Sequence, residues 1–177
     1  MIAGPDQESS SKGAALLWYV AHTRPRCEKK LAQYCEREKF PATLPCYRAI
    51  HTYKGKTRKT VEFQKPLFPG YVFLQLAREQ RQKIYQSDCV ANLLEVASQD
   101  LFEEQLKVVL HALETDLEIR LAPEIKEGQR VRITRGPLRG MEGWIEQRYR
   151  PGTVLLRIDF IGKAAAVKME LEDFEPA

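Results

Sequence analysis

The segment Lys65-Pro-Leu-Phe-Pro-Gly-Tyr-Val-Phe-Leu-Gln-Leu76 decides the fold of the N-terminal half of this chain. Its second half, Tyr71 to Leu76, has the aromatic and aliphatic residues that favour a β-strand. Pro66, Pro69 and Gly70 stand in front of this run and exclude a helix there. We therefore predict a central strand that is entered through a rigid aromatic turn.

Two large rings, Phe68 and Tyr71, bracket the Pro-Gly pair of this turn. A stiff backbone presents such rings at a low cost in side-chain entropy when a partner covers them. Buried core positions would explain the same two residues. The sequence leaves both interpretations open.

The bulk properties are those of a globular protein of 177 residues with a net charge of +4 and a pI near 8.9. No apolar run approaches the roughly 20 residues that span a bilayer, and the first 13 residues lack the pattern of a signal peptide. We expect a cytoplasmic protein without a membrane partner, preceded by a disordered lead at residues 1–14. The mild positive charge is compatible with nucleic-acid contact without requiring it.

Reactive residue types are present but scattered. The chain has four cysteines and three histidines, and neither a CxxC pair nor a GxSxG or P-loop motif occurs. Reduced thiols are therefore expected rather than disulfides or a zinc site. We predict no metal, no cofactor and no enzymatic activity, because the sequence contains no recognisable set of catalytic residues.

The first elements predicted are a strand from Leu16 to His22 and a helix that begins near Pro25. Between and just after them lie the cations Arg24, Arg26, Lys29 and Lys30. Cations at a helix start act against the helix macrodipole, so they favour an anionic partner. A solvated basic face is the alternative.

A hairpin is predicted next. Residues 46–53 indicate one strand, and residues 61–63 return toward the central strand. The tip between them carries four cations, which are Lys54, Lys56, Arg58 and Lys59. Such a tip is suited to contact phosphates, although lysines on hairpins also serve solubility.

Further along, the pattern predicts a short helix at 78–86, a strand at 89–96 and a helix from about 101 to 115. Together these segments predict an α+β sandwich of one sheet with flanking helices. A linker is expected at 116–123. From Glu124 onward, short strands alternate with glycine turns, which is typical of a small SH3-like β-barrel.

Two motifs carry a family resemblance. Gly128-x-x-Val131-x-Ile133-x-x-Gly136-Pro137-Leu138-x-Gly140-x-x-Gly143-x-Ile145 resembles a KOW motif. Leu17-Trp18-Tyr19-Val20 and Pro66-Leu67-Phe68-Pro69-Gly70-Tyr71-Val72-Phe73 resemble the NGN domain that precedes KOW in the NusG family. The resemblance implies an NGN domain at 15–115 and a KOW barrel at 124–177. The basic turn and hairpin are most similar to the specialised, RfaH-like and exopolysaccharide-operon antiterminators of that family.

The resemblance implies a transcription elongation and antitermination factor that suppresses pausing. In the family, the NGN domain binds the clamp helices of the RNA polymerase largest subunit. The positions that match this contact surface are Phe68, Tyr71, His22 and Val96. Arg24 and Lys30 match positions that face the non-template DNA of the transcription bubble in RfaH-like proteins, and Tyr34 lies one helical turn further on. Single-stranded DNA is bound by cations together with flat rings.

The KOW barrel of the family contacts a small-subunit ribosomal protein or the termination factor Rho. If residues 154–161 form one strand, Leu155 and Ile161 point away from the inward row that contains Val154 and Phe160. Ile161 matches the family's contact position. An apolar strand residue that the C-terminal segment near Phe174 covers is an equally good interpretation of Ile161. The implied partner-binding residues are Ile161 and Leu155.

Some family members fold the C-terminal domain as a helical hairpin. Here the pairs Gly136-Pro137 and Pro151-Gly152 interrupt any long helix, because Gly costs about 1 and Pro about 3 kcal/mol in a helix interior. We predict a barrel. A KOW-type RNA-binding or ribosome-associated protein without polymerase affinity is the alternative function.

Overall fold

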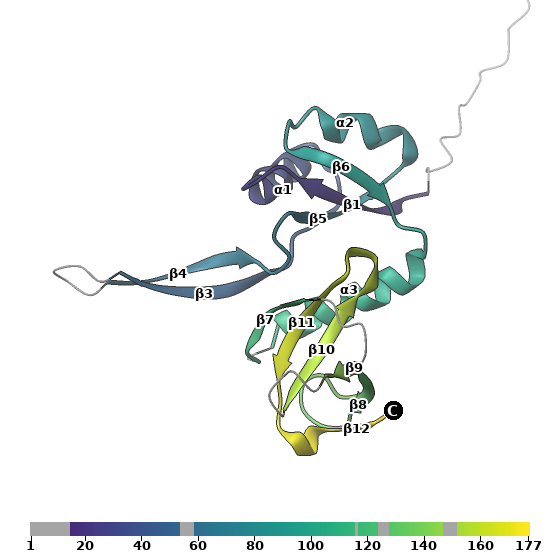
Figure 1. The fold of residues 1–177 in the computed structure, drawn as a ribbon. Coiled ribbons are helices and arrows are strands. Elements are labelled where there is room, and N and C mark those ends of the chain that lie inside the picture. Colours follow the sequence, from purple (N-terminus) through teal and green to yellow (C-terminus); the bar gives the residue numbers. More distant parts are fainter. Residues whose placement is uncertain (1–14, 54–58, 116, 124–127, 147–151) are drawn as a thin grey trace, which may run out of the picture.

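The computed structural model describes residues 15–53, 59–115, 117–123, 128–146 and 152–177. They form an α+β domain followed by a small β-barrel, as predicted (Figure 1). None of the helices in these ranges is long and apolar enough to cross a membrane. The predicted lead and part of the predicted basic tip, Lys54, Lys56 and Arg58, lie outside the described residues.

The N-terminal domain is built on an antiparallel four-stranded sheet in the order β2-β5-β1-β6. Its strands are β1 (Leu17–Thr23), β2 (Ala42–Thr43), β5 (Tyr71–Leu76) and β6 (Val90–Glu95). Strand β5 lies between two neighbours, so the predicted central strand is confirmed. It begins directly after the Pro-Gly turn, where the proline-rich segment ends.

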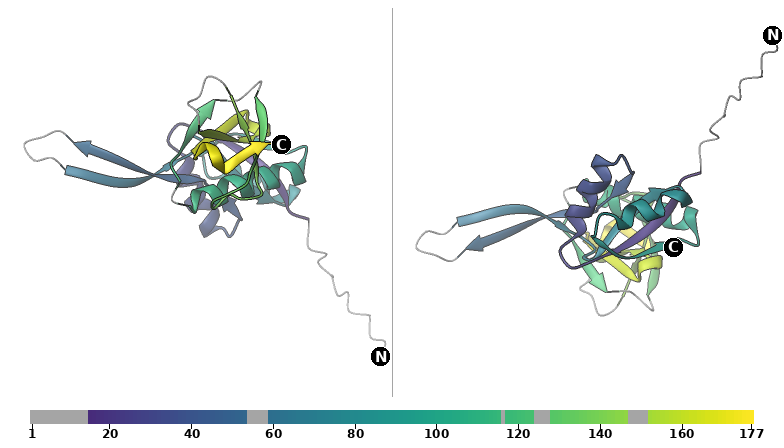
Figure 2. Two further views of the ribbon diagram at one scale, coloured as in Figure 1. Left: turned by 90° about the horizontal axis from the view of Figure 1, so that it is seen from below. Right: turned by 90° about the horizontal axis from the view of Figure 1, so that it is seen from above.

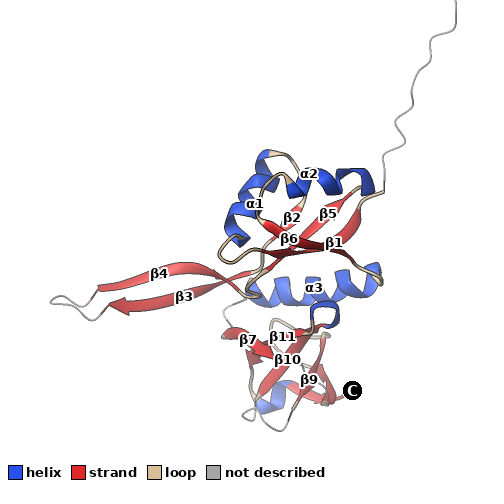
Figure 3. Ribbon diagram, turned by 45° about the horizontal axis from the view of Figure 1, so that its top comes forward, coloured by secondary structure: helices blue, strands red, loops and turns tan. Residues whose placement is uncertain are grey.

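Helices cover both faces of this sheet (Figure 3). Tyr19 and Ala21 of β1 pack with the first two helices, whereas Val20 packs with the third, as the period of two in a strand requires. Helices α1 and α2 thus share one face, and α3 lies on the other. The helices are α1 (Glu28–Arg37), α2 (Arg81–Tyr85, preceded by the 3-10 turn Arg78–Gln80) and α3 (Gln99–Leu113).

Strands β3 (Cys46–Tyr53) and β4 (Lys59–Pro66) form a separate two-stranded sheet, which we call the arm. The two strands pair along their whole length, from Cys46 opposite Pro66 to Tyr53 opposite Lys59. All views show the arm extending away from the body of the molecule (Figures 1 and 2). The predicted hairpin is confirmed, with a return strand longer than expected.

The C-terminal domain is a six-stranded sheet in the order β12-β8-β9-β10-β11-β7. Segment 119–123, expected to be linker, is strand β7 and pairs with β11, which satisfies the backbone of both strands. Residues 159–161, expected to continue a strand, form a 3-10 turn that ends at Gly162. The strands are β7 (Ile119–Pro123), β8 (Gln129–Ile133), β9 (Glu142–Ile145), β10 (Thr153–Ile158), β11 (Lys163–Lys168) and β12 (Phe174–Pro176), with a further 3-10 turn at Leu171–Asp173.

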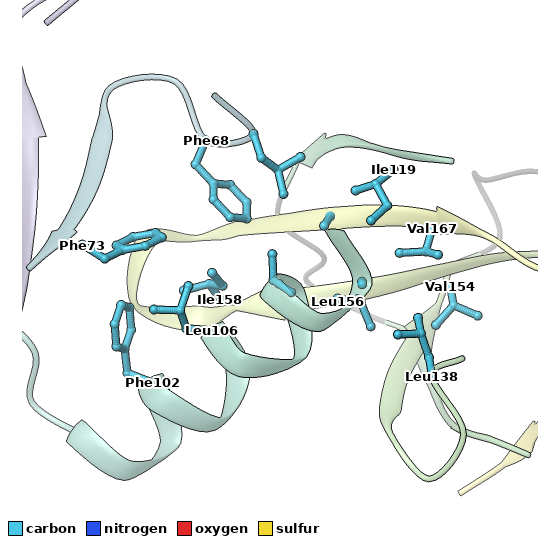
Figure 4. Packing of buried hydrophobic residues seen from close by; sticks show 14 of the residues in the cluster. Phe68, Phe73, Phe102, Leu106, Ile119, Leu138, Val154, Leu156, Ile158 and Val167 are labelled. Carbon is cyan, nitrogen blue, oxygen red and sulfur yellow. The ribbon is translucent and has the colours of Figure 1, made fainter. Parts of the chain in front are cut away.

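One hydrophobic core joins the two domains across α3 (Figure 4). Buried residues recur along α3 at Phe102, Leu106, Val109 and Ala112, the spacing of a helical face that contacts apolar neighbours. Phe73 of the N-terminal sheet packs edge-on against Phe102, with ring centroids 5.4 Å apart. Helix α3 also contacts strand β10 of the barrel. It is therefore a layer shared by both domains.

Candidate functional site

The Phe68-Pro-Gly-Tyr71 turn is held from both sides. Within the turn, the N–H of Tyr71 donates to the carbonyl of Phe68 (3.2 Å). Gly70 adopts a φ of +85°, a backbone angle that favours glycine. The Gly70 N–H donates to Glu28 Oε1 at the start of α1 (2.8 Å). The Gly70 carbonyl accepts from the N–H of Thr23 on β1 (2.8 Å). Three hydrogen bonds thus fix the backbone of the turn against β1 and α1.

This turn places Tyr71 directly opposite His22, because the two residues pair across β5 and β1. Their ring centroids are 5.4 Å apart with an interplanar angle of 34°. His22 is exposed and Tyr71 is half-buried. Together they form a two-ring surface at the end of the sheet, beside Gly70, which we call the ring pair.

Phe68 and Val96, two further residues that were expected to face a partner, are only 1% and 3% exposed. Both belong to the shared core between the N-terminal sheet, α3 and the barrel. The ring of Phe68 packs 6.1 Å from that of Phe73 (Figure 4). Of the two interpretations left open for Phe68, the structure shows the buried core position, because the barrel covers the sheet face to which this ring points. The surface position that the resemblance implied for Phe68 and Val96 is therefore wrong for this structure.

The basic cluster lies where β1 turns into α1. The N–H of Arg24 donates to the carbonyl of Cys89 (2.8 Å), and Arg26 has a φ of +62°, which is uncommon for a residue with a Cβ. Arg24 and Arg26 are exposed on this turn, and Lys30 follows on the first turn of α1, also exposed. All three cations are therefore accessible to solvent at the start of α1.

Lys29, predicted to be part of the same cluster, forms a hydrogen bond to the arm. Its Nζ donates to the carbonyl of Gln64 on β4 (2.6 Å). This bond links α1 to the base of the arm. Lys59 lies on the first residue of β4, at the outer end of the arm.

A hollow of about 330 Å³ lies between α1 and the α2–β6 turn. The Tyr34 ring borders it, donates its hydroxyl to the carbonyl of Lys83 (2.8 Å) and has the Arg37 guanidinium 5.3 Å from its centroid. Burial raises the pKa of the Tyr34 hydroxyl, and the nearby negative charge of Glu38 raises it further. The hydroxyl therefore remains a neutral donor. The lining residues are Lys30, Gln33, Tyr34, Arg37, Gln86, Ser87 and Cys89.

Sequence reasoning missed Arg37 as a part of this hollow. Its spacing was the available signal, since residues three apart in a helix lie side by side and Arg37 follows Tyr34 by three. A cation over an aromatic face is attracted by the ring quadrupole. The hollow thus combines two cations with one ring.

In the barrel, Leu155 is fully buried and packs with Ala164, Ala166 and Trp144. The expectation that a partner contacts Leu155 is therefore wrong for this structure, because side chains cover both faces of β10. Ile161 lies in the 3-10 turn, is half-buried and packs against the shared core. The strand alternation that was used to place it does not extend to this residue.

The four cysteines are free thiols, as predicted. Cys35 and Cys89 are buried, and burial raises the pKa of the Cys35 thiol to about 11. A thiol with a raised pKa is a poor nucleophile and a poor metal ligand. Within the described ranges, no three His, Cys, Asp or Glu side chains gather in a way that would hold a metal ion.

Residues 16–103 match the family model described as "Transcription termination factor nusG". The "Transcription termination/antitermination protein NusG" of Pasteurella multocida is 22% identical over 139 residues, which are 75% of this chain and 74% of that protein. A solved structure described as "Domain interaction in Thermotoga maritima NusG" gives a TM-score of 0.47 at 19% identity and covers 91% of this chain and 97% of its own. The N-terminal domain of this chain is thus similar to the NusG family over residues 16–103.

Proposed function

We propose that this chain is a transcription elongation and antitermination factor whose N-terminal domain binds the clamp helices of the RNA polymerase largest subunit. The observation that carries the proposal is the ring pair His22–Tyr71, held at a rigid turn in a domain that matches the NusG family. The protein acts by binding, holds the polymerase clamp closed and suppresses pausing. Its basic turn favours a place among the specialised, RfaH-like antiterminators.

The ring pair has the properties of a docking site. Aromatic residues at the centre of an interface contribute much of its binding energy, and a fixed backbone lowers the entropy lost on binding. Phe68 and Val96 would extend the same apolar surface, but the barrel covers them here. They join the contact with the polymerase only after the barrel leaves α3.

The basic turn and the hollow beside α1 favour contact with non-template DNA. Lys30 and Arg37 supply positive charge for phosphates, and the Tyr34 ring supplies a flat apolar surface. Single-stranded DNA is bound by this combination with little dependence on sequence. Arg24 and Arg26 extend the cationic surface along the entry to α1.

The barrel would couple this complex to a small-subunit ribosomal protein or to Rho. Ile161 would make such a contact after the barrel leaves α3, because here its side chain is half-buried against the shared core and the ring of its neighbour Phe160 lies 6.3 Å from that of Phe102 on α3. Leu155 takes no part, since it is buried.

A titration of the full chain against core RNA polymerase from the same source tests the proposal. Tyr71→Ala should weaken binding by about tenfold or more, as expected for a central aromatic residue. Tyr85→Ala is the matched control, because Tyr85 is 43% exposed at the end of α2, which lies on the opposite face of the sheet. Equal affinities for both variants would overturn the clamp-docking proposal. RNA binding without polymerase binding would favour the KOW-type RNA-binding alternative.

A further inference from the structure

Three of the four cysteines lie in one part of the N-terminal domain. Cys35 and Cys89 are buried in the core between the sheet and the helices α1 and α2, and the half-buried Cys27 packs against the same core. Cys27 is the residue before α1, and Cys89 is the residue before β6. The fourth, Cys46, begins β3 at the base of the arm. Cys27 and Cys89 are far apart in the sequence, so the fold alone brings them together.

The backbone holds Cys27 and Cys89 beside each other. The Arg24 N–H donates to the carbonyl of Cys89 (2.8 Å), and the Arg24 carbonyl accepts from the N–H of Cys27 (3.1 Å). One residue of the β1–α1 turn thus bonds to both cysteines. The two thiol side chains also form a hydrogen bond with each other. Burial raises the pKa of the Cys89 thiol, and this hydrogen bond raises it further, so Cys89 keeps its proton in the reduced protein.

The three clustered thiols differ in their access to solvent. Cys27 is half-buried, whereas Cys89 is 7% exposed and contributes to the wall of the hollow between α1 and the α2–β6 turn. Cys35 is completely buried. Oxidation of a thiol requires that the oxidant reaches the sulfur. Cys27 is therefore the thiol of this cluster that a dissolved oxidant reaches first.

We propose that Cys27 and Cys89 are a redox-active pair, which a peroxide converts into a disulfide. The Cys27 sulfur attacks one oxygen of the peroxide, the O–O bond breaks, and Cys27 becomes a sulfenic acid. The Cys89 sulfur then attacks the Cys27 sulfur, and the S–O bond breaks. With hydrogen peroxide, the two thiols together lose two electrons and two protons, and the peroxide leaves as two water molecules. The second step is intramolecular between groups already in contact, which compensates for the raised pKa of Cys89.

The disulfide narrows the hollow beside α1. One wall of the hollow is α1, which follows Cys27 directly, and the other is the α2–β6 turn with Cys89. A covalent bond is shorter than a hydrogen bond, so the disulfide draws the two walls together. Lys30 and Tyr34 lie in this hollow, and oxidation is therefore expected to weaken the binding of single-stranded DNA. This effect on DNA rests on the proposed function, whereas the disulfide itself does not.

The test uses the full chain before and after treatment with hydrogen peroxide. The free thiols of the denatured protein should fall from four to two, peptide mass spectrometry should find the link between Cys27 and Cys89, and dithiothreitol should reverse both changes. The link closes a loop from residue 27 to residue 89, so the melting temperature should rise by about 5 °C or more. The affinity for a short single-stranded DNA should fall by about fivefold or more, the effect of losing one stacked base.

Cysteine variants are the matched controls. Cys27→Ser should lose no thiol under the same treatment, and its DNA affinity should not change. Serine is a favoured residue before a helix, so this variant should fold. Cys46→Ser should form the link as wild type does, because Cys46 lies at the base of the arm. A link that includes Cys35 or Cys46, or a wild-type protein that keeps four thiols, would overturn the inference.

Failure of the proposed function gives a different result. If the link forms and raises the melting temperature while the reduced protein does not bind single-stranded DNA, the proposed DNA contact is wrong and the redox pair stands. If the reduced and oxidised proteins bind single-stranded DNA equally well, the link does not narrow the hollow, and that part of the inference is wrong.

Discussion

Gln105 on α3 and Asp159 at the end of β10 are joined by two hydrogen bonds. The Gln105 Nε2 donates to Asp159 Oδ2 (2.6 Å), and the Asp159 N–H donates to Gln105 Oε1 (2.9 Å). Asp159 also forms an ion pair with Arg157 (2.5 Å). One amide side chain of the N-terminal domain thus holds both the backbone and the carboxylate of the barrel turn.

Gln105→Ala should loosen the barrel from α3. Two exposed hydrogen bonds, one of them to a charged acceptor, contribute about 1 to 2 kcal/mol together. Urea unfolding should show a loss of this size. A double-mutant cycle with Asp159→Ala should give a coupling of at least about 0.5 kcal/mol, because the two residues contact each other. Additive effects of the two substitutions would contradict the arrangement.

The shared core makes a second prediction about α3. Phe102→Ala should lower the free energy of unfolding by about 3 to 5 kcal/mol, because the ring is buried and contacts Trp18 and Phe73. Leu101→Ala is the control, since Leu101 is 48% exposed on the same helix, and it should cost less than about 1 kcal/mol. Denaturant unfolding followed by tryptophan fluorescence measures both. Equal losses would show that α3 is not the shared layer.

Much of this fold could be predicted from local patterns. The aromatic and aliphatic residues from Tyr71 to Leu76 predicted β5, and the helical stripe through Leu106, Val109 and Leu113 predicted α3. Strand β7 could not be found in this way, because its pairing with β11 depends on a contact between segments some forty residues apart. A linker and an edge strand have similar local composition, and only the partner strand distinguishes them.

The candidate site was predicted less completely than the fold. Rigidity of the turn at Gly70 followed from its own residues, and the ring pair followed from the family resemblance. The burial of Phe68 did not, since it depends on where the barrel lies relative to the sheet. Lys29 was likewise assigned to the basic cluster, although a carbonyl on β4 binds it. Contacts between domains are not encoded in the residue spacing of either domain.

Gly143 gives a third prediction, which concerns the barrel. A Cβ at this position would overlap Val154 Cγ1 and lie 3.2 Å from the carbonyl oxygen of Leu155, because β9 and β10 approach closely. Gly143→Ala should therefore destabilise the protein by about 1 to 3 kcal/mol through overpacking. Gly136→Ala is the control, since nothing lies within 4 Å of its added Cβ and only its φ of +76° is strained. Thermal unfolding should rank Gly143→Ala as the less stable variant, and the reverse order would contradict this packing.

The last prediction concerns acid stability at the junction of β1 and α3. Glu103 accepts hydrogen bonds from Lys107 Nζ (2.6 Å) and Trp18 Nε1 (3.1 Å). These two bonds lower the pKa of the Glu103 carboxyl below its usual 4.5, and the bond from Lys107 has the larger effect. A carboxyl with a lowered native pKa stabilises the fold above its unfolded pKa. That contribution is lost as the pH falls from about 4.5 through the native value.

Glu103→Gln should therefore flatten the loss of stability below pH 4.5, while stability near neutral pH decreases. Lys107→Ala should flatten it in the same direction, because it removes the larger cause of the shift. Thermal unfolding followed by tryptophan fluorescence between neutral and acid pH measures the effect, and Trp18 is a direct bonding partner of the carboxyl. Parallel pH profiles for wild type and Glu103→Gln would mean that Trp18 and Lys107 do not hold the ionised carboxyl in solution.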